Sequence, residues 1–148
     1  MIAKPLATEH APYFSRYIDL VQGEDYFEEL DKSFVQCTSL FSNLPIEKHE
    51  YRYAAGKWTP KEMLMHIIDT ERIFAYRALA IARNDKTSLP GFDEDAYALN
   101  IDLTHRSLES IIAEFHAVRQ ATKSFLQHLP VEKTMLIGVA NGHPTSAR

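Results

Sequence analysis

Cysteine is almost absent from this sequence: Cys37 is the one thiol among 148 residues. A lone cysteine excludes an intrachain disulfide, and its position on an apolar helical stripe favours a buried thiol over a reactive one. The sequence also lacks any apolar run near the roughly 20 residues of a membrane span, and residues 1–12 lack the apolar core of a signal peptide. We therefore expect a cytoplasmic protein with no membrane partner.

An excess of basic residues is missing as well. Sixteen Lys and Arg residues stand against 20 Asp and Glu residues, which gives a formal net charge of -4 and a pI near 6.0. Without a general positive field to attract a polyanion, we expect no nucleic acid partner. With 148 residues, 45% of them apolar, the chain is long enough for one globular domain with its own core, residues 1–148.

Glycine and proline are scarce, at five and seven residues, and they lie between long segments of helical periodicity. Because no segment alternates convincingly in the manner of a strand, the pattern predicts an all-α fold. Long helices are expected at 24–43, at 60–83 and within 103–129, the last with Thr104 as its candidate cap, and shorter ones at 13–21 and after Asp93.

The end of the sequence departs from this pattern. Residues 131–142 are expected to form a connecting loop, with a candidate extended piece at 135–139. Residues 143–148 are expected to be the opening turn of another helix. Three long helices and the start of a fourth predict a four-helix bundle whose last member is missing from this chain, or is supplied by another chain.

The helix expected at 60–83 has the clearest start in the sequence. Thr59 can cap it, Pro60 suits its first position, and Glu62 can complete a capping box. His66 follows one turn later, and Asp69 lies three residues beyond it on the same face, where it could orient the imidazole ring. His66 is therefore a candidate metal ligand, with Asp69 as its partner.

His66 also has a simpler interpretation, because a histidine at the border of an apolar face can merely pack there. The other six histidines are scattered, most of them expected to be solvated, and neither an HExxH motif nor paired cysteines are present. Ser-His-Asp, phosphate-loop and activated-thiol chemistries find no supporting pattern either. The residues alone therefore leave the catalytic residues unknown.

Two charged residues lie on apolar helical faces. Glu71 is near the middle of the apolar face of its helix, and Arg119 sits on the stripe between Phe115 and Leu126. Because charges leave water when they are paired or bind a ligand, we expect an ion pair between Glu71 and Arg119. The alternative is that Glu71 is a carboxylate of a functional site.

Several segments resemble the DinB/YfiT-like superfamily, in particular its DinB_2 branch. The run KWTPKEMLMHIIDTERIFAYR at 57–77 is similar to the second-helix signature, and LPGFD at 89–93, AVR at 117–119 and GHPTSAR at 142–148 follow in the order and spacing of that branch. The resemblance covers most of the chain. It implies a four-helix bundle of the DinB/YfiT type, usually a homodimer, with a divalent metal such as zinc or nickel held by three histidines.

His66 matches the family histidine of the second helix. The resemblance places the other two histidines on the last helix, in an H-x-x-x-H-like motif that would follow the end of this sequence. We therefore expect the chain to be a fragment in which the last helix is missing or truncated, the alternative being a natural variant without the usual site.

Two functions of different class follow. The first is a metal-dependent enzyme, a hydrolase or a low-molecular-weight-thiol transferase, in which the metal activates a water or a thiol for a small-molecule substrate. The second is a non-catalytic, metal-free dimeric bundle, or a scaffold that binds a small ligand. Two histidines spaced four apart after Arg148 would favour the enzyme.

Overall fold

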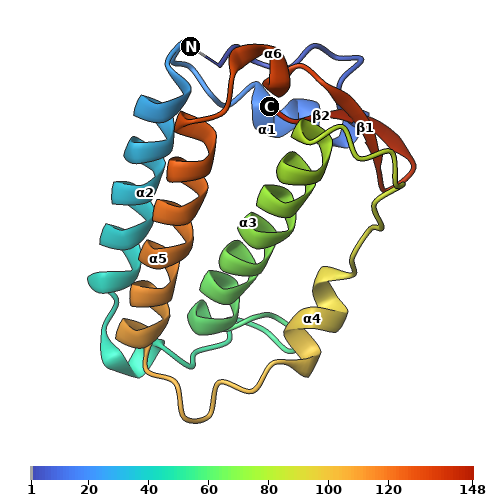
Figure 1. Ribbon diagram of the computed structural model, residues 1–148. Helices are drawn as coiled ribbons and strands as arrows, with labels where there is room; N and C mark the ends of the chain where they lie inside the picture. The colour runs from blue at the N-terminus through green and yellow to red at the C-terminus, as the bar shows by residue number, and fades with distance from the viewer. Residues whose placement is uncertain (1) are drawn as a thin grey trace.

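The computed structural model describes residues 2–148, and three long helices dominate it (Figure 1). They are α2 (Tyr26–Ser42), α3 (Pro60–Ala82) and α5 (Leu108–Gln127). The shorter elements are two 3₁₀ turns at Pro12–Phe14 and Ile46–Lys48, and the helices α1 (Ser15–Ile18), α4 (Glu94–Asn100) and α6 (Val131–Thr134). The predicted mainly helical fold is confirmed, including the short helix that Asp93 caps.

The three long helices lie side by side, and α5 contacts both α2 and α3 (Figure 1). α2 runs in the direction opposite to α3 and α5. α4 packs near the start of α3 at one end of the molecule, whereas α6 and a two-stranded hairpin contact α3 at the other end. None of the helices within residues 2–148 is both long enough and apolar enough to span a membrane.

Side-chain caps fix where the first two long helices begin. At α2, the Asp25 carboxylate accepts the N–H groups of Phe27 and Glu28. At α3, the predicted capping box is present: Thr59 Oγ1 accepts the Glu62 N–H at 3.2 Å, and Glu62 Oε2 accepts the Thr59 N–H at 2.7 Å. These bonds satisfy donors that a helix start leaves free, so the register of α3 is set locally.

The start of α5 differs from the prediction. Ser107 is the cap, with its Oγ accepting the Ser110 N–H at 3.2 Å. Thr104, the expected cap, instead donates its N–H to the Asp102 carboxylate at 2.9 Å. The aspartate thereby stabilises a turn, and the helix begins only after that turn is complete.

Two apolar clusters hold the long helices together. One joins the first halves of α3 and α5 to the end of α2, through Phe41, Leu64, Met65, Ile68, Leu108, Ile111 and Phe115. The other packs the ends of α3 and α5 against the N-terminal segment and the hairpin, through Ile2, Ala80, Ile81, Ala82, Leu89, Leu126, Leu129, Ala140 and Ala147. α3 is thus held at both ends, and its middle lies between the two clusters.

The C-terminal residues form a β-hairpin instead of the expected start of a helix. β1 (Ile137–Ala140) pairs antiparallel with β2 (His143–Ser146). The two connecting residues, Asn141 and Gly142, have positive φ angles of 51° and 76°. Two consecutive positive φ angles are characteristic of type I′ turns, for which Asn-Gly is a preferred sequence. The helix expected at 143–148 is therefore wrong, because this dipeptide turns the chain back on itself.

The hairpin is held from both sides by other segments. The backbone of Leu89 donates to the Val139 carbonyl at 2.9 Å and accepts the Asn141 N–H at 2.9 Å. On β2, the Ser146 N–H donates to the Glu9 carbonyl at 2.9 Å. The N-terminal segment and the connection after α3 therefore both pair with the hairpin backbone.

A buried ion pair between Glu9 and Arg148 strengthens the contact between the N-terminal segment and β2. The Glu9 carboxylate accepts two hydrogen bonds from Arg148, from Nε at 2.9 Å and from Nη2 at 2.7 Å. Both side chains are about nine-tenths covered. The Arg148 hydrogen bond lowers the pKa of the Glu9 carboxyl, and this effect outweighs the opposite effect of burial.

Candidate functional site

The middle of α3 is joined to α5 by the predicted ion pair between Glu71 and Arg119. Arg119 Nε lies 3.0 Å from both carboxylate oxygens, and Nη2 lies 2.9 Å from Oε2. Its Nη1 also donates to the Leu30 carbonyl of α2 at 3.0 Å. The side chains of Arg119 and Glu71 are 9% and 11% exposed. The prediction is confirmed, and the guanidinium links all three long helices between the two apolar clusters.

His66 lies on α3 near the end that α4 covers. Its ring packs against Trp58, with the ring centroids 4.9 Å apart. The imidazole lines a cavity of about 10 Å³, close to the space one water molecule needs, together with Glu62, Asp69, Phe92, Glu94, Tyr97, Ala98 and Ile101. Three other histidines bind backbone carbonyls through a ring nitrogen, whereas no such bond to His66 is present within residues 2–148.

Asp69 lines the same cavity but does not hold the His66 ring as expected. Its nearest cationic partner is Arg72, at 3.6 Å, and no hydrogen bond joins the carboxylate to His66 in the described part of the chain. Burial raises the pKa of the Asp69 carboxyl, an effect that Arg72 only partly opposes. Arg72 is itself held at 2.7 Å by Glu114 of α5, so the carboxylate of Asp69 has no strong partner.

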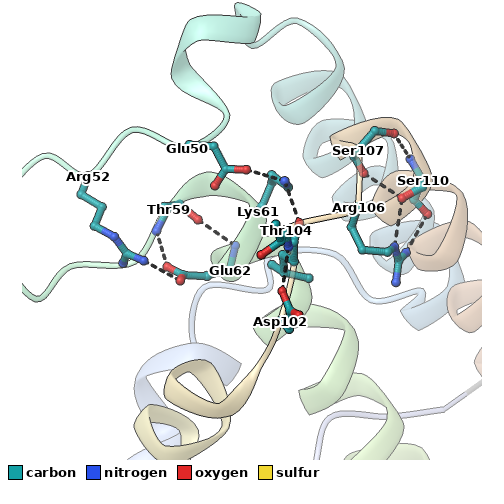
Figure 2. Close-up of polar contacts among 11 residues, drawn as sticks. Glu50, Arg52, Thr59, Lys61, Glu62, Asp102, Thr104, Arg106, Ser107 and Ser110 are labelled. Atoms are coloured by element: carbon teal, nitrogen blue, oxygen red, sulfur yellow. Dashed lines mark hydrogen bonds and ion pairs between the residues drawn. The ribbon is translucent and has the colours of Figure 1, made fainter.

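A larger cleft of about 370 Å³ adjoins this cavity. It lies where the start of α3 faces the connection between α4 and α5, and Ile101 and Leu103 are part of its lining. The other lining residues are Glu50, Thr59, Glu62, Asp102 and Thr104, which Figure 2 labels. Glu62 and Ile101 line both spaces. The volume is near the lower end of the range of small-molecule sites, roughly 300–1,000 Å³.

Glu62 is the polar group between the cavity and the cleft. Besides its capping bond to Thr59, it accepts a hydrogen bond from Arg52 Nη2 at 2.6 Å (Figure 2). Burial alone would raise the pKa of the Glu62 carboxyl, but the hydrogen bonds from Arg52 and Thr59 together lower it. These two donors therefore favour the ionised form of Glu62.

Lys61 joins two residues that line the cleft, Glu50 and Leu103. Its residue surface is 5% exposed, and its Nζ donates to the Glu50 carboxylate and, at 3.1 Å, to the Leu103 carbonyl (Figure 2). One buried ammonium thus connects the segment before α3, α3 itself and the segment before α5. The cleft is consequently built from three segments that are held together at their base.

The comparison with protein families identifies the chain. The DinB superfamily model matches residues 29–148, which include all three long helices except the first residues of α2. This chain belongs to the DinB superfamily. No curated protein matches it at a significant level.

The fold of this DinB-superfamily chain is similar to that of a solved structure, YfiT from Bacillus subtilis. The TM-score is 0.64 and the identity is 13%, over 94% of this chain and 79% of YfiT. YfiT is described as a probable metal-dependent hydrolase with an unusual four-helix bundle topology. At this identity the similarity establishes the DinB/YfiT fold predicted from the sequence. It does not extend the function of YfiT to this chain.

The residues of this DinB-superfamily chain that surround His66 do not complete a metal site by themselves. Within residues 2–148, no three His, Cys, Asp or Glu side chains are grouped so that they could hold a metal ion. Glu62 accepts hydrogen bonds from Arg52 and Thr59, and Asp69 lies 3.6 Å from Arg72. His66 is thus one free donor, whereas zinc sites in proteins commonly need three or four protein ligands.

Sequence reasoning missed the cleft and its anchors. The roles of Lys61 and Arg52 depend on tertiary structure, which brings them to their partners Glu50, Leu103 and Glu62. Figure 2 shows the contacts with Glu50 and Glu62. One signal was available: Lys61 follows the proline at the first position of α3 and points inward on an amphipathic helix. A lysine on an apolar helical face requires a carboxylate partner for the same reason that Arg119 does.

Proposed function

We propose that this domain is the core of a metal-dependent enzyme, a hydrolase or a low-molecular-weight-thiol transferase, in which His66 is one ligand of a divalent metal such as zinc or nickel. The observation that carries the proposal is the position of His66. It is a histidine without a hydrogen-bonded partner among the described residues, and it lines a cavity that opens beside a cleft of small-molecule size.

Within residues 2–148 no ligand group is complete, so the proposal assigns the remaining ligands to a further helix or to another chain. The family resemblance implies two histidines on a last helix. A divalent ion held by His66 and two further histidines would supply an activated water or thiol. The described residues would contribute one ligand, the cavity wall and the neighbouring cleft for a small-molecule substrate.

The test is the metal content of natively purified protein, measured by elemental analysis on the full gene product and on the 148-residue chain. We expect about one metal per protein in the former if two histidines follow Arg148, and weak or no binding in the latter. His66→Ala should abolish metal binding in the full protein. The matched control is His105→Ala, which removes an exposed histidine of the α4–α5 connection and should leave the metal in place. Equal zinc or nickel affinity with and without His66 would refute the assignment.

The second candidate function is a metal-free dimeric bundle or a scaffold that binds a small ligand. It is supported by the same absence of a ligand group within residues 2–148. If the full gene product contains no metal, this candidate becomes the better account. Homodimer formation is common to both candidates, and light scattering coupled to size-exclusion chromatography would measure it.

A further inference from the structure

Among the described residues, every buried cation except one forms an ion pair with a carboxylate. Lys61, Arg77, Arg119 and Arg148 are all largely covered. Three of them contact a carboxylate, in the pairs Lys61–Glu50, Arg119–Glu71 and Arg148–Glu9. Arg77, which is 8% exposed, has no ion pair with any residue in the range 2–148. Its positive charge is therefore removed from most of the solvent without a counter-charge.

The hydrogen bonding of Arg77 is also incomplete. Its Nη2 donates to the carbonyl of Pro90 at 2.7 Å, and its Cζ lies 5.4 Å from the centre of the Phe74 ring. A carbonyl and a ring face carry no net charge, whereas a guanidinium has five N–H donors and a full charge. Pro90, which supplies this carbonyl, is an exposed residue.

Burial lowers the pKa of the Arg77 guanidinium, and no carboxylate among residues 2–148 acts in the opposite direction. The group nevertheless stays protonated, because arginine does not lose its proton in proteins. A buried cation of this kind is costly unless it is paired. The other three buried cations indicate that this fold ordinarily pairs such charges.

Arg77 lies on the same stripe of α3 as His66. At 100° per residue, positions 66, 70 and 77 differ by about 40° or less around the helix, and the span from 66 to 77 is about 16 Å along the axis. Between them, Thr70 has a buried Oγ1 with no hydrogen-bond partner among the described residues. The stripe therefore holds three polar groups whose partners are missing or incomplete.

We propose that Arg77 binds an oxyanion, the carboxylate or phosphate group of a small-molecule ligand, at the end of this stripe. The planar fork of a guanidinium matches two oxygens of either group, and the ligand supplies the counter-charge that the described residues do not. Identifying the ligand as the substrate, with its anionic group about three helical turns from His66, rests on the proposed function. The oxyanion site itself does not.

The experiment measures binding of inorganic phosphate and of succinate to the metal-stripped protein, by calorimetry and by the Arg Nε–Hε signals in NMR spectra. We expect saturable binding by the wild type and a loss of about tenfold or more in Arg77→Gln, because a charge-assisted hydrogen bond is removed. Arg77→Lys, which keeps the charge and loses the fork, should bind with intermediate affinity. The matched control is Arg83→Gln, which removes an exposed arginine at the end of the same helix and should bind as the wild type does.

A purely structural Arg77, which only holds the Pro90 carbonyl, gives a different result. Wild type and Arg77→Gln would then bind both anions equally, or neither anion would bind saturably, and either outcome overturns the proposal. If Arg77→Gln does not fold, the shift of the Arg77 Nε–Hε signal on titration of the wild type decides the question. His66→Ala should leave anion binding unchanged, so a failure of the metal assignment and a failure of the oxyanion site are separately visible.

Discussion

Replacement of Arg119 by methionine should be among the most destabilising single changes in this protein. The substitution removes three contacts of 2.9–3.0 Å to the Glu71 carboxylate and leaves that carboxylate 11% exposed in the gap between the two apolar clusters. Removing one partner of a buried pair costs about 3–5 kcal/mol, most of it the penalty of the uncompensated charge. The Leu30 carbonyl loses little, because Ser33 Oγ still donates to it at 2.9 Å.

Urea denaturation followed by far-UV circular dichroism measures this loss as a change in the free energy of unfolding. The double variant Glu71→Leu with Arg119→Met should recover much of the loss, because both charges are then gone and apolar groups replace them. The matched control is Lys123→Met, one turn further along α5, whose partner Asp31 is 53% exposed. That change should cost about 1 kcal/mol or less.

The coupling between Glu71 and Arg119 is the decisive quantity. We expect the loss of unfolding free energy in the double variant to be smaller than the sum of the losses in the two single variants, by about 2 kcal/mol or more. Strictly additive losses would show that the two groups do not interact in the folded protein. The placement of α3 against α5 would then need another explanation.

Two further predictions concern a helix cap and the second buried ion pair. Thr59→Ala removes the acceptor of the α3 capping box and should lower the free energy of unfolding by about 1 kcal/mol. The control Thr104→Ala changes a position outside the helix and should have a much smaller effect. Equal losses in the two variants would contradict the assignment of the cap. Because Arg148 lowers the folded-state pKa of Glu9, the pair stabilises the protein above the unfolded pKa, and that contribution is lost as the pH falls through the lowered folded-state value. Glu9→Gln should therefore reduce stability at neutral pH and flatten the acid limb of a stability–pH profile, and an unchanged acid limb would show that Glu9 does not titrate differently on folding.

Local patterns predicted the parts of the fold that depend on residues close together in sequence. The Thr59–Glu62 capping box and the apolar stripe of α3 are short-range features, and α3 begins and ends where they indicate. The pairing of Glu71 with Arg119 was predictable although the two lie 48 positions apart in the sequence, because each was an isolated charge on an apolar face. A buried charge restricts its possible partners strongly enough to act over long range.

The hairpin, the Glu9–Arg148 pair and the cleft beside His66 could not be predicted in this way. The Asn141–Gly142 dipeptide indicates a hairpin turn, whereas a proline near the start of 143–148 indicates the start of a helix. The structure contains the hairpin. The pairing of Glu9 with Arg148 joins positions 139 residues apart, and no local sequence pattern predicts it. The candidate site at His66 was located on its helix, but its cavity and cleft depend on how α4 and the following segment fold back.

The hairpin at the C-terminal end also bears on aggregation. A two-stranded sheet normally has two edges with free N–H and C=O groups, and such edges can recruit strands from other molecules. In this protein, backbone bonds from Leu89 cover part of one edge, and the Glu9 carbonyl covers the Ser146 N–H on the other. The carboxylate of Glu9 holds that cover in place through Arg148, so protonation at low pH loosens it. Acid conditions should therefore expose the β2 edge before the helices unfold, and self-association should begin with intermolecular strand pairing at this hairpin.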